Sequence, residues 1–325
     1  MRKIRIGLTA LAALAVVAAA QFAQADDFPS RPVRIVVAFP PGGPTDFVGR
    51  VVADKMSTLL GQRVYIDSKP GANGTLGGGD VAKSDPDGYS LFLTTAGAVT
   101  VSPHIMANMP FDTFRDFAPV TLVTKVSEVL VVSPKLGIKS VKELVALAKE
   151  KPGAITFAST GIGSPPHLAQ LMLDTSAGVT FLHVPYRGAA PAVTDMLGGQ
   201  VQVVSLDVPV VISQIQAGTL VPIGIAGDKR DAILPEVPTL AEQGYPNTDA
   251  SNWYALLAPA KTPPDIIAKL NKATNDALND AQVHEKLVKA GATPIGGTPE
   301  QLGTFMKAEY EKWGRLVKEH DIKEQ

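Results

Sequence analysis

The chain has 325 residues, 45% of them hydrophobic, which is enough for two domains with sizeable cores. Its net charge is −1 and no run of like charges occurs, which argues against nucleic acid or an anionic membrane surface as the main partner. It contains no cysteine, which excludes disulfides and a lipid-modified cysteine.

The N-terminus has the pattern of an export signal. Basic residues precede the apolar stretch 6–20, and the tripeptide AQA follows at 23–25. This order is typical of a cleaved secretory signal peptide. The apolar stretch is shorter than the roughly 20 residues of a membrane span, so an uncleaved anchor is the less favoured alternative. We therefore expect a signal peptide at 1–25 and a periplasmic mature protein that begins at Asp26.

In the first half of the mature chain, short apolar runs alternate with segments of helical period. The alternation predicts strands and intervening helices of a mostly parallel α/β sheet. The strands are expected at 33–39, 63–68, 89–95, 118–124 and 128–133, and the helices at 46–60 and 74–83.

The same order restarts in the second half, which predicts a second, similar lobe. Its strands are expected at 154–160, 179–186, 201–207 and 220–227, with a helix at 165–175. A strand at 253–259 and helices at 264–279, 280–290 and 299–319 follow, and we expect these helices to pack against the first lobe. The expected division is 26–127 with 251–325 for lobe 1 and 128–250 for lobe 2, with hinges near 124–128 and 249–253.

The loops after the first strand of each lobe are similar. FPPGGPTD spans 39–46 and STGIGSPPH spans 159–167, and each leads from glycines into a helix. We expect Thr45 and Ser164 to cap the two helices, with Asp46 in the first turn of the first helix. A helix N-terminus beside glycines can bind an anion through its free N–H groups. For either loop alone, an ordinary strand-to-helix turn is the alternative.

Nucleotide-binding loops fit less well. A P-loop would need a glycine at the position of Val48, followed by a lysine. A dinucleotide fingerprint begins with Gly161 and Gly163 but has Pro166 where the third glycine is needed. We therefore expect no nucleotide, and no other cofactor.

Metal and catalytic sites are also weakly indicated. The five histidines are scattered, and no H-E-x-x-H motif occurs, so no metal site is expected. A hydrolase with Ser164, His167 and Asp207 would have the residue types of a triad. However, the G-x-S-x-G elbow is missing, so we expect no enzyme.

Several segments together resemble one family. They include PSRPVRIVVAFPPGGPTD, KPGANGTLGG, DPDGYSLFLTT, STGIGSPPHL, VPYRGAAPAVTDMLGGQV and WYALLAPAKTPPDIIAKLN. The chain resembles the Bug family, the periplasmic solute-binding receptors of tripartite tricarboxylate transporters. The resemblance implies an α/β chain of the type II periplasmic binding protein fold, with two similar lobes, mostly parallel sheets and a ligand cleft between them. It implies a monomer that binds a small di-, tri- or aromatic carboxylic acid and delivers it to membrane subunits. Presentation of the ligand to a signalling partner stays open as an alternative.

The resemblance also implies the site. The two loops would grip one carboxylate group, and the rest of the ligand would point toward the loop 94–100 and Asp207. Helix capping is an equal alternative for Asp46. Arg187 would pair with a second carboxylate, or be a surface residue. The expected ligand contacts are Pro41, Gly42, Gly43, Thr45, Asp46, Thr95, Ala96, Ser159, Gly163, Ser164, His167, Arg187 and Asp207.

Overall fold

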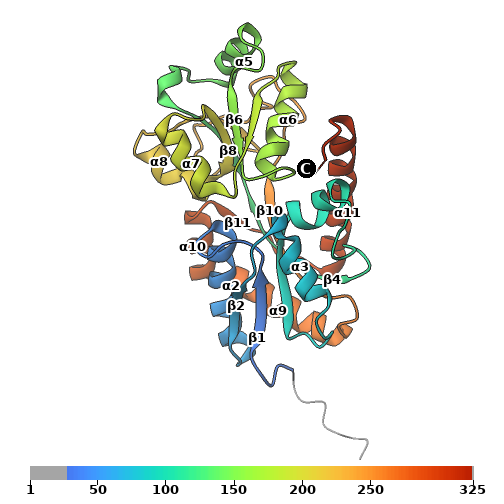
Figure 1. Cartoon of the computed structure of the whole chain (residues 1–325). Coiled ribbons are helices and arrows are strands. Elements are labelled where there is room, and N and C mark those ends of the chain that lie inside the picture. Colours follow the sequence, from blue (N-terminus) through green and yellow to red (C-terminus); the bar gives the residue numbers. More distant parts are fainter. Residues whose placement is uncertain (1–27, 324–325) are drawn as a thin grey trace, which may run out of the picture.

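The computed structural model describes residues 28–323, so the expected signal peptide at 1–25 lies outside the described residues. Figure 1 shows two α/β lobes joined end to end, with the C-terminal helix α11 running along one side of both. Lobe 1 is built on a six-stranded sheet of order β11-β4-β10-β3-β1-β2, and lobe 2 on a five-stranded sheet of order β7-β6-β8-β5-β9.

Lobe 1 contains the first and last parts of the described chain. Its strands are β1 (Val33–Val37), β2 (Val64–Ser68), β3 (Ser90–Thr95), β4 (Phe117–Val126), β10 (Asn252–Pro259) and β11 (Ala292–Pro294). Its helices are α2 (Pro44–Leu60), the 3₁₀ turn η1 (Ala72–Gly74), α3 (Thr75–Ala82), the π-helix η2 (Gly97–Val101), α4 (Ser102–Ile105), α9 (Pro264–Asn279), α10 (Ala281–Lys289) and α11 (Pro299–Glu319).

Lobe 2 is formed by the middle of the chain. Its strands are β5 (Glu128–Val132), β6 (Thr156–Ser159), β7 (Leu182–Pro185), β8 (Val203–Asp207) and β9 (Val221–Ala226). Its helices are the 3₁₀ turn η3 (Pro134–Leu136), α5 (Val141–Glu150), α6 (Pro165–Ala177), α7 (Ala189–Gly198) and α8 (Val208–Gln216).

Each sheet is covered by helices on both faces. In β1, Ile35 packs into the apolar cluster that contains α2 and α9, whereas Val36 packs into the cluster that contains Leu302 and Met306 of α11. Neighbouring residues of a strand point to opposite faces, so an uninterrupted apolar run fits a strand buried on both sides. The expected α/β fold with two lobes is therefore confirmed.

Both sheets are mixed, so the expected parallel pairing holds for only part of each sheet. In lobe 1, β1 pairs in parallel with β2 and β3, but β10 lies antiparallel between β3 and β4. In lobe 2, β6 pairs in parallel with β7 and β8, but β5 lies antiparallel between β8 and β9. The exceptions are β5, β10 and the edge strand β11, which pairs antiparallel with β4. Of these, β5 and β10 begin where the chain passes from one sheet to the other.

The sequence predicts that the C-terminal helix packs against lobe 1. In the structure it packs against both lobes. Its first turns contact lobe 1, but Trp313 and Val317 lie in the apolar cluster of lobe 2. At its end, His320 Nε2 lies 2.9 Å from Thr175 Oγ1 of α6. Figure 1 shows this helix reaching from the lobe 1 sheet to the level of α6, so it forms a second connection between the lobes.

Elements that the sequence does not predict include α5, the π-helix η2, α4 and the short edge strand β11. Among residues 28–323, no helix has the length and apolar character needed to cross a membrane.

Candidate functional site

The lobe 1 loop leads from β1 into α2 and leaves backbone donors unused. Gly43, not Thr45, is the N-cap of α2, and Pro44 occupies the first helical position. Thr45 and Asp46 follow, and their N–H groups have no acceptor among residues 28–323. These N–H groups belong to the first turn of a 17-residue helix, where the helix dipole favours an anion.

Asp46 holds this loop together. It is 3% exposed, and its Oδ2 accepts hydrogen bonds from Gly42 N at 3.0 Å and from Arg50 Nε at 2.9 Å. Burial alone would raise the pKa of Asp46, but the bonds from Arg50 and Gly42 outweigh it and hold the pKa below its ordinary value. Asp46 is therefore an ionised group that closes the loop without capping α2, and its Oδ1 is buried with no hydrogen-bond partner among residues 28–323.

The lobe 2 loop leads from β6 into α6 and uses its donors internally. Ser164 is the N-cap by position, as expected, but its hydroxyl donates to Gly161 O at 2.7 Å and does not cap the helix. Pro165 and Pro166 fill the first two helical positions and have no N–H group. Gly163 N donates to His167 Nδ1 at 3.1 Å. The anion site expected at this helix start therefore has few backbone donors.

A stacked histidine pair supports the lobe 2 loop. The rings of His167 and His183 lie 4.0 Å apart at an interplanar angle of 15°. Burial, aided by His183, lowers the pKa of His167 to about 3, and burial lowers the pKa of His183 to about 4. Both rings are neutral near pH 7. Because His167 Nδ1 accepts from Gly163, its Nε2 carries the hydrogen and is a neutral donor.

The two lobes meet where the lobe 2 loop faces α4. Gly163 has φ +72°, and a Cβ placed on it would overlap Ile105 Cδ1 and lie 3.3 Å from Val101 Cγ1. Both of these side chains belong to lobe 1, at the end of the π-helix and in α4. A glycine is therefore needed here for the conformation and for the close approach of the lobes.

The segment after β3 forms the wall beside this contact. Thr95 and Ala96 are 4% and 1% exposed, so both expected ligand residues present little side-chain surface. Thr100 Oγ1 donates to Ala96 O at 2.6 Å within the π-helix. Thr95 pairs with Tyr254 across the β3–β10 ladder, which places it next to the buried polar groups around Asp207.

Asp207 lies at the end of β8, as expected, but its carboxyl group is engaged. It is 7% exposed, and its Oδ2 accepts from Tyr254 OH at 2.6 Å. Asn252 Nδ2 lies 3.4 Å from both of its oxygens, and Glu128 is its partner across the β5–β8 ladder. Sequence reasoning missed Glu128 and Tyr254, although Glu128 is the only charged residue in its apolar strand.

The remaining expected residues differ in exposure. Ser159 is fully buried, with Oγ 2.6 Å from His183 Nε2. Pro41 and Arg187 are exposed, and Arg187 has no hydrogen-bond or ion-pair partner among residues 28–323. Arg187 is therefore a free cation in the segment between β7 and α7.

The structure does not assemble the hydrolase triad. Ser164 donates to Gly161 O, His167 accepts from Gly163 N, and Asp207 bonds to Tyr254. None of the three bonds to another of the three in the described part of the chain. In the same residues, no group of three or more histidine, aspartate or glutamate side chains is placed to hold a metal ion.

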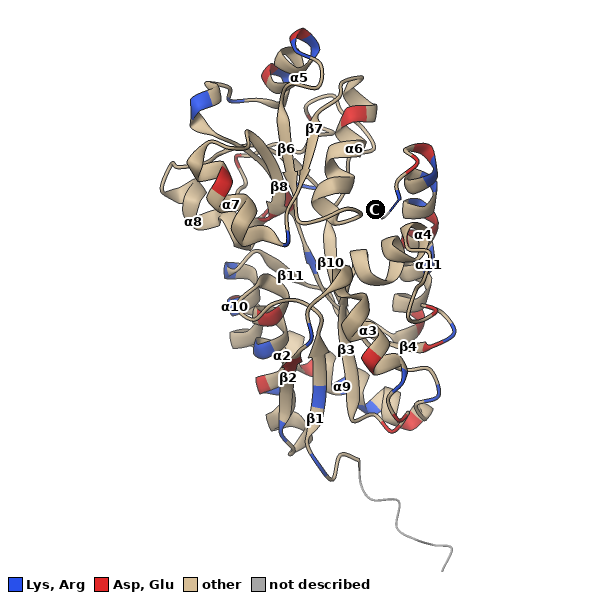
Figure 2. Cartoon of the chain, viewed as in Figure 1, with Lys and Arg blue, Asp and Glu red and all other residues tan. Residues whose placement is uncertain are grey.

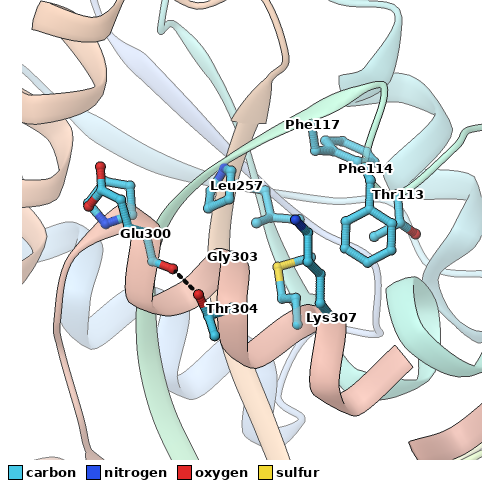
Figure 3. A pocket seen from close by; sticks show the side chains of 11 residues that line it. Thr113, Phe114, Phe117, Leu257, Glu300, Gly303, Thr304 and Lys307 are labelled. Atoms are coloured by element: carbon cyan, nitrogen blue, oxygen red, sulfur yellow. Dashed lines mark hydrogen bonds between the residues drawn. The ribbon is translucent and has the colours of Figure 1, made fainter. Parts of the chain in front are cut away.

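A hollow of about 460 Å³ lies away from both loops, between α11 and the segment before β4. Figure 3 shows it bordered by Phe114, Phe117 and Leu257 on one side and by Gly303, Thr304 and Lys307 of α11 on the other. It shares no residue with the two loops. Figure 2 shows Lys and Arg interspersed with Asp and Glu over the outer helices, so the drawn face has no large region of one sign.

Known proteins resemble the chain over nearly its whole length. A family model described as tripartite tricarboxylate transporter family receptor matches residues 48–322. Protein BugT of Bordetella pertussis is 39% identical over 300 residues, which are 92% of each chain. The solved periplasmic binding protein BugD is 34% identical with a TM-score of 0.83, covering 92% of this chain and 100% of that one. A Rhodopseudomonas palustris protein solved with adipate is 32% identical with a TM-score of 0.86, covering 91% and 99%.

Proposed function

Because this chain belongs to the tripartite tricarboxylate transporter receptor family, we propose that it captures a small carboxylic acid between its two lobes. The mature protein works in the periplasm and passes the closed, loaded form to the membrane subunits of a tripartite transporter. The family consists of periplasmic solute-binding proteins of the two-lobed α/β fold. The acid itself, the membrane partner and the individual contact residues are parts of the proposal.

The start of α2 is the observation that carries the proposal. The free N–H groups of Thr45 and Asp46 lie at the carboxyl end of β1, where α/β sheets bind ligands. Asp46 uses its own charge on Gly42 and Arg50, so it keeps the loop in shape for an anion. One carboxylate of the ligand binds here.

The lobe 2 loop completes the enclosure. His167 Nε2–H is a neutral donor from this loop, and Gly163 brings the loop against α4 of lobe 1. A ligand that contacts both loops stabilises the closed arrangement, because only that arrangement lets both lobes bind it. Arg187, which has no ion-pair partner in the described part of the chain, is the cation for a second carboxylate. The similar R. palustris protein was solved with adipate, a dicarboxylate, which supports a dicarboxylic acid as the first ligand class to test.

A thermal-shift screen of the mature protein tests this function. The protein is stripped of ligand by unfolding and refolding, then screened against mono-, di- and tricarboxylic acids, aromatic acids, amino acids and sugars. A ligand at 100 times its Kd adds about 2.7 kcal/mol to the free energy of unfolding. For a chain of this size, we expect the Tm to rise by several degrees, at about 2–4 °C per kcal/mol.

The outcomes separate the possible ligands. A shift from an acid, with none from its amide, supports the carboxylate site. A preference for dicarboxylic over monocarboxylic acids that disappears in Arg187→Gln assigns the second carboxylate to Arg187. Shifts from sugars alone would overturn the proposal. Loss of uptake of the labelled acid on deletion of the gene supports delivery to a transporter, whereas unchanged uptake with lost induction of acid-dependent genes supports the sensor alternative.

A further inference from the structure

A pair of buried carboxyl groups lies where the chain crosses between the lobes. Glu128 begins β5 directly after the crossing, and Asp207 ends β8. The two residues are direct partners in the antiparallel β5–β8 ladder, so their side chains leave the sheet on the same face. They are 1% and 7% exposed. We call these two residues the carboxyl pair.

Among residues 28–323, no cation forms an ion pair with the carboxyl pair. Ser205 Oγ donates to Glu128 Oε2 at 2.9 Å, and Tyr254 OH donates to Asp207 Oδ2 at 2.6 Å. Asn252 adds an amide near Asp207, and on the other side of β5 the ladder partner of Glu128 is Ala226. These neutral groups, from β8, β9 and β10, surround the pair.

The nearest lysine along the chain is turned to another partner. Lys125 Nζ lies 4.0 Å from Asp228 and 5.8 Å from the centre of the Phe305 ring. It forms no hydrogen bond or ion pair with either member of the carboxyl pair, so the pair must reduce its charge in another way.

Two adjacent buried carboxylates cannot both keep a full negative charge. Their mutual repulsion and the loss of hydration favour one shared proton. Burial and the neighbouring Asp207 raise the pKa of Glu128 well above its ordinary value. Burial also raises the pKa of Asp207, although the bonds from Tyr254, Glu128 and Asn252 oppose this. The proton therefore belongs chiefly to Glu128, which donates it toward Asp207, while Ser205 occupies the other glutamate oxygen.

The carboxyl pair is connected to the ligand loop of lobe 1. The hydroxyl of Thr45 lies beside the hydroxyl of Tyr254, close enough to influence its pKa, and Tyr254 in turn donates to Asp207. Thr45 is also the residue whose free N–H group faces the proposed anion site. One tyrosine side chain thus separates the carboxyl pair from the proposed ligand carboxylate.

We propose that Glu128 and Asp207 share one proton in the native protein, and that this proton sets the affinity of the neighbouring loop for an anionic ligand. The inference rests on the proposed carboxylate site at α2. With the proton, the pair carries one negative charge, and without it the pair carries two. Since the ligand is also negative, the protonated pair binds it more tightly, and by linkage the bound ligand makes the pair hold its proton more firmly.

The direction of the pH dependence follows from this linkage. Affinity is full while the pair keeps its proton and decreases as the pH rises through the raised pKa of the pair. One additional charge, separated from the ligand by one tyrosine side chain in a medium of effective dielectric constant near 20, weakens binding on the order of tenfold. The other titratable groups described at the site do not gain negative charge as the pH rises above 6. His167 and His183 are already neutral, Asp46 is already ionised, and burial beside Asp207 raises the pKa of Tyr254 well above its ordinary value.

The test compares wild type with Glu128→Gln. Glutamine keeps an oxygen for Ser205 and an N–H donor for Asp207, but it has no proton to lose. The Kd for adipate, or for the acid with the largest shift in the thermal screen, is measured by calorimetry between pH 6.5 and pH 9. We expect wild type to lose affinity roughly tenfold with rising pH, and Glu128→Gln to keep the low-pH value throughout.

Asp174→Asn is the matched control. Burial raises the pKa of Asp174, on α6, to about 7, so this carboxyl group titrates in the measured range but lies away from the crossing. The asparagine keeps the acceptor for Phe181 N. We expect this variant to retain the wild-type decrease in affinity. A decrease that vanishes in Asp174→Asn and persists in Glu128→Gln would overturn the proposal.

A second readout needs no ligand. In the Asp174→Asn background, which removes the carboxyl group with a pKa of about 7, the infrared spectrum at neutral pH should show the band of a protonated carboxyl group that is absent once Glu128→Gln is added. If Glu128→Gln fails to fold, Tyr254→Phe serves instead, since loss of the donor to Asp207 should move the decrease in affinity to higher pH.

The outcomes separate this inference from the proposed function. A protein that binds no acid contradicts the proposed function, and the infrared band alone then tests whether the proton is shared. A flat wild-type affinity, or no difference in the band, overturns this inference while the carboxylate site stands.

Discussion

The loops 39–46 and 159–167 correspond position by position around their helix caps but differ in the donors they present. Each has a glycine of positive φ one residue before the helix cap, Gly42 in lobe 1 and Gly163 in lobe 2. In each, the N–H of that glycine donates to the side chain four residues later, which is Asp46 in lobe 1 and His167 in lobe 2. The same hydrogen bond within the loop is thus accepted by a carboxylate in lobe 1 and by a neutral imidazole ring in lobe 2.

The second helical position makes the larger difference. It is Thr45 in lobe 1, which has a free N–H group, and Pro166 in lobe 2, which has none. Under the proposed function, lobe 1 holds the charge of the ligand, whereas lobe 2 contributes the His167 donor and the contact with lobe 1. Substitutions at matched positions of the two loops test this proposed division.

Removal of the lobe 1 donor should have the largest effect. Thr45→Pro deletes the N–H group at a first-turn position where α6 itself tolerates Pro-Pro. We expect the Kd for the acid to rise about 10- to 100-fold, because a hydrogen bond to a charged group contributes about 1.5–3 kcal/mol. Thr45→Val keeps the N–H group and loses only the hydroxyl beside Tyr254, so it should change the Kd by less. Calorimetry at pH 7 measures both, and equal losses in the two variants would contradict the backbone role.

The second-largest effect is expected for Gly163→Ala, which should hinder the closing of the two lobes around the ligand. The alanine has to adopt the glycine's φ of +72°, and its Cβ overlaps Ile105 Cδ1 of lobe 1. We expect a loss of about 1–2 kcal/mol in ligand binding, part of it from the strained backbone. Gly178→Ala has a similar φ of +62° in open space and serves as the control for strain. If Ile105→Ala does not restore affinity to Gly163→Ala in a double-mutant cycle, the overlap between the lobes is not the cause.

Much of the fold could be predicted from the sequence because the decisive signals are local. The bounds of α9 and α11 are those expected at 264–279 and 299–319. In α11 a proline follows Thr298, which forms a capping box with Gln301. The helix α5 was overlooked even though Ser140 caps it and its apolar residues have helical spacing. The π-helix after β3 has no such signal, since its residues are small or apolar throughout.

The site was predicted less completely, because its chemistry depends on pairings between distant segments. The sequence places Asp207 at a strand end, but only the β5–β8 register shows that Glu128 lies beside it. Likewise, Ser164 has the right position for a cap, but the bend of the loop turns its hydroxyl to Gly161 O. Residue type and position were thus readable from the sequence, whereas the partner that decides each role was not.

The reciprocal substitution, Pro166→Ala, should have the smallest effect and gives the sharpest test of the comparison. It restores an N–H group at the lobe 2 position that matches Thr45. A neutral hydrogen bond contributes about 0.5–1.5 kcal/mol net, and loss of the proline ring costs part of this in chain entropy, so we expect the Kd to fall by about two- to fivefold. Pro165→Ala is the control, because the matching lobe 1 position, Pro44, is also a proline. If both variants bind the acid equally, the number of backbone donors does not separate the lobes. If Pro166→Ala alone binds more tightly, the missing N–H group is what makes lobe 2 the weaker anion site.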